Sequence, residues 1–235
     1  MEISLRHQLI YQALILQKEI EKSEIIKENV SVYLGVKALF IVFFVTIVSI
    51  KYLDVEISIG IMHFIQSINF LKRFTEHIPD LLFQFVVLAT VLMWTVYFYK
   101  LHRKKFDTET KFLQLAATVL PVAYLAKTLL KFVFGRTFPR DWLLHNQQLA
   151  FQWFKHWSSS FPSGHMVVFA AFGAAILIYY PKYRKPVLIS LILLGAALVG
   201  TDYHFLSDVI AGAYLGIITS YSIWYLFEKL KTRSL

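Results

Sequence analysis

Residues 160–180 read SFPSGHMVVFAAFGAAILIYY, a short polar opening followed by an uninterrupted apolar run. A run of this length can cross the hydrocarbon core of a bilayer as a helix, which needs about 20 residues. Pro162 and Ser163 suit the first turn or cap of that helix, and Gly164 leaves its backbone open to a ligand. The stretch therefore predicts a membrane span with an anion-binding site at its N-terminus.

The whole chain has the composition of an integral membrane protein. Of its 235 residues, 57% are hydrophobic and 17% are charged, whereas globular proteins have about 45–50% and about 25%. The absence of cysteine excludes a disulfide scaffold and a thiolate metal site. We expect an all-α, polytopic bundle with about six transmembrane helices, at residues 33–50, 81–100, 112–134, 163–181, 186–203 and 206–227.

Two amphipathic segments flank the first span. Residues 1–31 predict an interfacial helix, and residues 55–70 predict a segment that lies at the surface or re-enters the membrane. We therefore divide the chain into an N-terminal amphipathic cytoplasmic segment (1–31), a first transmembrane helix with an outer amphipathic segment (32–80) and a core (81–235).

The distribution of basic residues predicts the orientation. Fifteen Lys and Arg fall in the N-terminal segment, the 100–111 and 181–186 loops and the C-terminal tail, against six on the opposite side. Because cytoplasmic loops carry the excess of basic residues, both termini are expected in the cytoplasm, and residues 135–161 outside a bacterial inner membrane. This topology also explains the net charge of +9 without a nucleic-acid partner.

Three clusters of ionisable residues stand at the outer ends of predicted spans. The first contains Lys127 and Lys131, four residues apart and so on one helix face, followed by Arg136 and Arg140. These cations either bind an oxyanion or extend to lipid head groups. The second contains His165, after Ser163 and Gly164.

The third cluster lies in GTDYHFLSDVIAG, residues 200–212. His204 and Asp208 are four residues apart, so the carboxylate can orient the imidazole, with Asp202 nearby. The alternative is a helix cap beside an interfacial histidine.

Together the clusters predict displacement at the phosphorus of a phosphate ester. The cations and the helix N-terminus would hold the oxyanion, one histidine would attack, and the other would protonate the leaving alkoxide. No acidic cluster suits magnesium, so we expect a reaction that needs neither metal nor cofactor.

SFPSGHM at 160–166 and HFLSDVIAG at 204–212 resemble two signatures of the type 2 phosphatidic acid phosphatase superfamily. The resemblance covers about residues 81–227 and implies a six-helix core with His204 as nucleophile, Asp208 as its partner and His165 as general acid. It also implies that Ser163 and the Gly164 amide bind phosphate.

The chain departs from the family pattern at two arginine positions. Phe138 stands where the first signature, Lys-x6-Arg-Pro counted from Lys131, has arginine, and Leu198 stands where the third has arginine. Arg136 is expected to substitute, because the flexible Gly135 lets its side chain turn back into the site. Arg140 is a second candidate, although it is expected to head into the outer loop.

The resemblance implies an integral membrane phosphatase that acts on a lipid phosphate or pyrophosphate at the outer face. Its expected partners are membrane lipids and a phospholipid, isoprenoid or lipid A phosphate substrate. Two alternatives stay open: a lipid phosphotransferase, and a non-catalytic protein that binds or transports lipid phosphates.

Overall fold

The computed structural model describes residues 35, 37–67, 81–155 and 157–233, and its named elements are all helices. The all-α prediction is confirmed. In chain order the elements are η1 (Ser49–Leu53, a π-helical turn), α2 (Asp54–Ser67), α4 (Leu82–His102), α5 (Thr108–Phe134), α6 (Pro139–His145), α7 (Gly164–Tyr179), η2 (Pro181–Tyr183, a 3-10 turn), α8 (Arg184–Gly200) and α9 (Leu206–Arg233).

The chain divides into two compact units, Met1–Phe44 and Val45–Leu235. In the first unit the structure describes only residues 35 and 37–44, which are helical. The predicted amphipathic segment 1–31 lies outside the described residues. The second unit contains every element named above.

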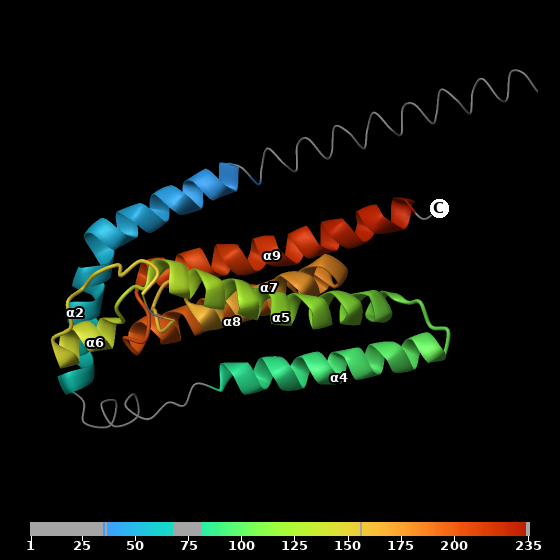
Figure 1. The fold of residues 1–235 in the computed structure, drawn as a ribbon, viewed down its shortest axis with the longest axis horizontal. Helices are drawn as coiled ribbons and strands as arrows, with labels where there is room; N and C mark the ends of the chain where they lie inside the picture. Colours follow the sequence, from blue (N-terminus) through green and yellow to red (C-terminus); the bar gives the residue numbers. More distant parts are fainter. Residues whose placement is uncertain (1–34, 36, 68–80, 156, 234–235) are drawn as a thin grey trace, which may run out of the picture. The chain divides into compact units, whose positions relative to one another are not determined.

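The second unit is a helical bundle with α7 at its centre, packed between α5 and α9 (Figure 1). Gly212 and Gly216 of α9 permit the close approach of α7. A Cβ atom on Gly212 would lie 2.8 Å from the Ser163 carbonyl oxygen, and one on Gly216 would lie 2.2 Å from that of Val167. Small residues spaced four apart are typical of tightly packed membrane helices.

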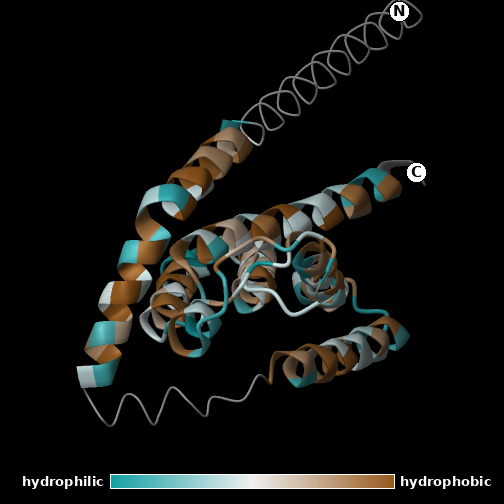
Figure 2. Cartoon of the chain, turned by 60° about the vertical axis from the view of Figure 1, so that its left-hand side comes forward, coloured by the Kyte–Doolittle hydropathy of each residue, from teal (hydrophilic) through white to brown (hydrophobic). Residues whose placement is uncertain are grey.

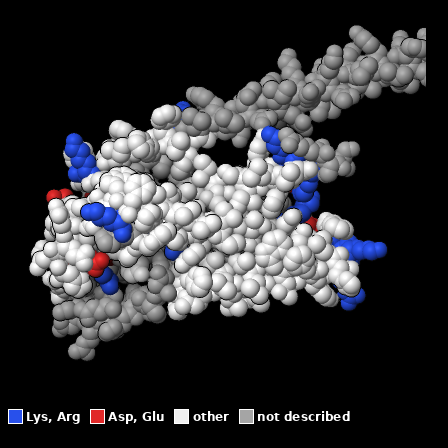
Figure 3. All heavy atoms as spheres, viewed as in Figure 1, with Lys and Arg blue, Asp and Glu red and all other residues white. Residues whose placement is uncertain are grey.

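Five stretches of the described chain are helical, long and apolar enough to cross a membrane: Lys37–Ser67, Leu82–His102, Thr108–Phe134, Pro181–Gly200 and Leu206–Lys231. Large apolar side chains of α4, such as Phe83, Leu88 and Leu92, are exposed on the outside of the bundle. Most residues of α4 are hydrophobic (Figure 2). Charged side chains gather toward the two ends of the bundle (Figure 3). The protein is a multi-pass integral membrane protein.

Two predicted spans differ from the structure in length. The predicted span 163–181 is the 16-residue α7, about 24 Å long at 1.5 Å per residue and so shorter than a bilayer core of about 30 Å. Helices on several sides shield α7 from lipid. The predicted span 33–50 continues through η1 into α2, giving 31 helical residues, more than one crossing needs.

Candidate active site

The three sequence clusters meet at one end of the bundle. Lys131, in the last turn of α5, donates a hydrogen bond from Nζ to the Ser159 carbonyl oxygen at 2.6 Å. The Ser163 amide before α7 donates to the Asp208 carbonyl oxygen of α9 at 3.0 Å. Residues from α5, α7 and α9 therefore share one site, next to α6 and α2 (Figure 1).

Gly135 directs the chain from α5 into this site. It ends α5 in the left-handed conformation, with φ of 54°, and its amide donates to the Lys131 carbonyl oxygen. A Cβ atom here would lie 2.2 Å from the Gln152 carbonyl oxygen, so only glycine fits. The next residue, Arg136, is thereby turned inward, and its amide donates to the Ser159 hydroxyl at 2.7 Å.

His204 and Asp208 form a buried pair. His204 is 1% exposed, Asp208 is fully buried, and Nδ1 of the imidazole lies 3.6 Å from Oδ2 of the carboxylate, just beyond hydrogen-bond distance. The same Oδ2 accepts a hydrogen bond from the Phe205 amide at 3.0 Å. Burial lowers the pKa of His204 below its usual value, although the Asp208 charge opposes this effect. The imidazole is therefore neutral at neutral pH and can act as a nucleophile.

His165 also lies close to Tyr203. The ring centroid of Tyr203 is 5.2 Å from that of His204 and 5.9 Å from that of His165. Unlike His204, His165 is only half-buried. One site thus contains a buried histidine and a more accessible one.

The start of α7 presents donors to an anion. The Ser163 hydroxyl is buried and has no hydrogen-bond partner among the described residues. The missing side chain of Gly164 makes room for Lys127, since a Cβ atom there would lie 3.1 Å from Cδ of that lysine. A helix N-terminus, an unsatisfied hydroxyl and a lysine therefore converge. Lys127 is placed here by the tertiary structure, not by a motif.

Phe138 fills the position of the missing signature arginine. Its ring centroid lies 5.8 Å from that of His204 and 5.2 Å from Nζ of Lys131. The aromatic ring therefore lies inside the site, beside both of these side chains.

Arg136 occupies a different position from the predicted phosphate clamp. It is 3% exposed, and Nη1 donates to Oδ1 of Asp208 at 2.6 Å and to the Ser207 hydroxyl at 2.7 Å. Nη2 donates to Oδ2 of Asp54 at 2.8 Å. Two carboxylates thus neutralise the guanidinium and use both of its terminal nitrogens. In the structure Arg136 therefore contacts protein carboxylates at the place where the sequence analysis expected it to bind phosphate.

Arg140 also differs from expectation, because it points back toward the site. It is half-buried, and its Nε and Nη2 donate to the Thr201 carbonyl oxygen at 3.2 and 2.7 Å. Pro139 begins α6 directly after Phe138, and this short helix turns Arg140 inward. Arg140 lines a cavity of about 210 Å³ with Phe138, Asp141 and Tyr203. Arg136 turns inward after Gly135 as predicted, whereas the placement of Arg140 differs from the prediction.

Two buried carboxylates near the site are not among the signature residues of the family. Asp202 is fully buried and has a left-handed backbone with φ of 55°. Burial raises the pKa of Asp202 to about 6, an effect that Ser58 and the Arg140 charge oppose. Asp54, from α2, was missed by the sequence analysis. The only sequence feature that could have pointed to Asp54 is its position as an acidic residue between two apolar runs.

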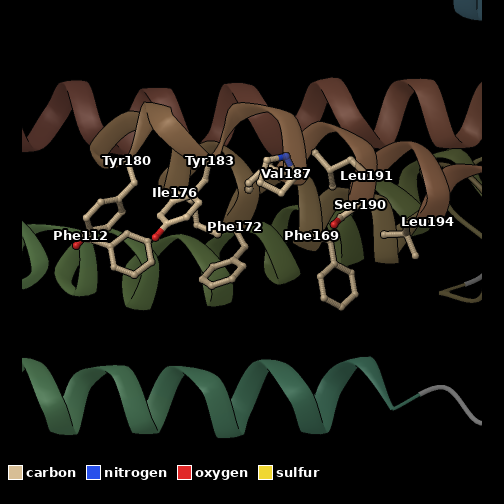
Figure 4. A pocket seen from close by; sticks show the side chains of 12 residues that line it. Phe112, Phe169, Phe172, Ile176, Tyr180, Tyr183, Val187, Ser190, Leu191 and Leu194 are labelled. Carbon is tan, nitrogen blue, oxygen red and sulfur yellow. The ribbon is translucent and has the colours of Figure 1, made fainter.

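A large apolar pocket lies away from the histidines. Figure 4 shows this cavity of about 620 Å³ between α5, α7 and α8, lined by residues such as Phe112, Phe172 and Leu191. Its walls are almost entirely hydrocarbon, so it offers no chemistry to a phosphate. In the described ranges, no cluster of three His, Asp or Glu side chains could hold a metal ion.

The chain is thus a helical, multi-pass membrane protein with a histidine–carboxylate pair beside a cationic helix N-terminus. The chain belongs to the PAP2 superfamily, whose family model matches residues 111–232, just over half of the chain. The predicted family is confirmed.

Individual relatives match more narrowly. The lipid A 1-phosphatases of Rhizobium etli and Rhizobium johnstonii are each 44% identical over 57 residues, which is 24% of this chain. The match spans about a quarter of each relative, 25% and 23% of their lengths. A solved structure, a PAP2-type phosphatidylglycerolphosphate phosphatase from Bacillus subtilis, aligns with a TM-score of 0.44 and 18% identity, covering 83% of this chain and 96% of that one.

Proposed function

We propose that this protein is a membrane phosphatase that hydrolyses a lipid phosphate or pyrophosphate through a phosphohistidine. The observation that carries the proposal is the buried, neutral His204 paired with Asp208, beside the unsatisfied Ser163 hydroxyl at the α7 N-terminus. A nucleophile, its orienting carboxylate and an oxyanion site are the parts that displacement at phosphorus needs.

The reaction takes two displacements. Nε2 of His204 attacks phosphorus, the bond to the leaving oxygen breaks, and His165 gives that oxygen a proton. His165 then takes a proton from water, whose oxygen attacks the phosphohistidine and releases inorganic phosphate while His204 is regenerated. Lys127, Lys131, Ser163 and the Gly164 amide stabilise the charge that spreads over the equatorial oxygens. No metal takes part.

The substrate is a lipid whose phosphate lies at the membrane surface, because such a lipid reaches the site by lateral diffusion. The names of the lipid A 1-phosphatase relatives support including lipid A phosphates among the candidate substrates. The test is phosphate release by detergent-solubilised protein in EDTA from four lipids: lipid A, phosphatidic acid, phosphatidylglycerophosphate and undecaprenyl pyrophosphate. His204→Ala is the control. No release from any lipid, or release only on adding a divalent metal, would contradict the proposal.

The active site faces the outside of a bacterial inner membrane in this proposal. Its support is the basic 100–111 loop, which joins α4 to α5 at the end of the bundle opposite α6 (Figure 1). The natural chain has no cysteine, so single cysteines need no background removal. A membrane-impermeant maleimide applied to intact spheroplasts is expected to label Gln147→Cys and to spare Lys104→Cys. Labelling of Lys104→Cys alone would invert the topology.

Arg140 is expected to bind the substrate phosphate. Arg140→Ala should lower kcat/KM mainly through a higher KM, by roughly 10- to 100-fold, since a hydrogen bond to a charged group contributes about 1.5–3 kcal/mol. Arg140→Lys should restore only part of the lost kcat/KM, because lysine lacks the planar two-donor geometry of arginine. Arg103→Ala, at the other end of the bundle, is the control. A KM unchanged from wild type in Arg140→Ala would remove Arg140 from the phosphate site.

A further inference from the structure

Helix α2 brings a carboxylate to the site from outside the residues that the family model matches. Asp54, at the first position of α2, is 1% exposed. Its Oδ1 accepts a hydrogen bond from the Ser207 amide at 3.0 Å, and its Oδ2 accepts from Nη2 of Arg136 at 2.8 Å and from the Ser207 hydroxyl. Both carboxylate oxygens are therefore satisfied, as a buried charge requires.

Arg136 connects this carboxylate to the nucleophile. Its other terminal nitrogen, Nη1, donates to Asp208 at 2.6 Å, and the second oxygen of Asp208 lies 3.6 Å from Nδ1 of His204. The contacts thus run from Asp54 through Arg136 and Asp208 to His204. All four side chains are at most 3% exposed, so water screens these charges little.

The charge balance of the cluster explains why two carboxylates are present. Arg136 divides its single positive charge between Asp54 and Asp208, which leaves Asp208 part of its negative charge to act on His204. Without Asp54, the guanidinium would turn wholly to Asp208 and neutralise it. His204 would then lose the charge that orients its ring and stabilises the positive imidazole formed during attack.

We infer that Asp54 is a positioning residue that holds Arg136 between two carboxylates and so keeps Asp208 available to His204. The inference rests on the proposed function for the role of His204. Asp54 reaches the nucleophile only through Arg136 and Asp208, so its loss lowers kcat and leaves KM near the wild-type value.

The main test is Asp54→Asn, which removes the charge and keeps the shape. We expect kcat to fall about 10- to 100-fold, the usual scale for groups that orient a functional histidine. Glu56→Gln is the matched control, since this acid lies on the same helix but is exposed. A wild-type kcat in Asp54→Asn, or a raised KM with normal kcat, would overturn the inference.

A double variant tests whether Asp54 acts through Arg136. The losses in Arg136→Gln and Asp54→Asn should not multiply in the combination, because Asp54 acts on Asp208 only through Arg136, and once Arg136 is replaced the further loss of Asp54 has no route to His204. Multiplied losses would mean that Asp54 acts independently of Arg136. Thermal unfolding in detergent shows whether Asp54→Asn folds. If it does not fold, Ser207→Ala is the second variant, because it removes the bridging hydroxyl and leaves no buried charge unpaired. Ser207→Ala should lower kcat and leave KM unchanged, and an unchanged kcat would contradict the inference.

A binding measurement decides the inference without turnover. Orthovanadate mimics the five-coordinate phosphorus and bonds to a nucleophilic histidine, whereas inorganic phosphate reports only the ground-state oxyanion site. Quenching of tryptophan fluorescence can follow both, as the chain has five tryptophans. Asp54→Asn should weaken the binding of vanadate about 10-fold or more and change the binding of phosphate little. If Asp54→Asn binds vanadate as tightly as the wild-type protein does, the inference is overturned. If the wild-type protein hydrolyses no lipid, the proposed function is overturned instead.

Discussion

Replacing His204 with alanine is expected to abolish turnover, lowering phosphate release more than about 10⁴-fold on every lipid of the panel. The loss is large because His204 supplies the atom that bonds to phosphorus, and its Asp208 partner cannot take over that role. Since burial lowers the pKa of His204, the neutral imidazole is available across the neutral range, and this nucleophile is lost only as the pH falls through that lowered pKa.

The measurement is phosphate release together with trapping of the labelled protein. Wild-type protein quenched with ³²P-labelled substrate should carry acid-labile, base-stable phosphate, as phosphohistidine does, and His204→Ala should carry none. His102→Ala, an exposed histidine of α4, is the control for loss of a histidine alone. Label that persists in His204→Ala would assign the nucleophile to another residue.

Replacing His165 with alanine is expected to cost about 10²–10⁴-fold on lipid substrates, the usual range for general acid–base catalysis. The loss should be much smaller for the first displacement on an aryl phosphate, whose leaving group needs no proton. His165 also activates water, so the phosphohistidine should accumulate in this variant. The half-buried position of His165 beside Tyr203 suits a group that meets both leaving group and water.

Burst kinetics with p-nitrophenyl phosphate separate these two steps. His165→Ala should release nitrophenol in a rapid burst, followed by slow steady turnover, while a lipid phosphate shows no burst. Tyr203→Phe keeps the ring that lies near both histidines and serves as the control for packing. Equal losses for both leaving groups, with no burst, would rule out His165 as the proton donor.

Much of the fold was predictable because its signals are local in the sequence. Apolar runs identified α4, α5, α8 and α9 as spans, since a bilayer demands long uncharged stretches wherever it is crossed. Lengths were less predictable where protein replaces lipid. The 16-residue α7 lies within the bundle, so the hydrocarbon thickness does not set its length.

The pairing of His204 with Asp208 was also accessible from sequence, although His204 lies just before α9 and not within it. His204 and Asp208, four residues apart, were predicted to face each other. In the structure, Nδ1 of His204 lies 3.6 Å from Oδ2 of Asp208. The motif around Ser163 and His165 likewise carries its geometry in a few consecutive residues at a helix start. The roles of these residues are proposals, but their placement near one another follows from local backbone geometry.

The membrane class, the all-helical fold and the short-range motifs can be read from neighbouring residues, because hydrophobic runs and close spacing are local signals. The contacts of the two arginines depend instead on the tertiary packing. Asp54 and Arg136 are 82 positions apart, and Arg140 and Thr201 are 61 apart, so no periodicity connects them. A buried guanidinium takes whichever carboxylates the folded chain brings within reach, and that choice depends on how α2, α6 and α9 pack together.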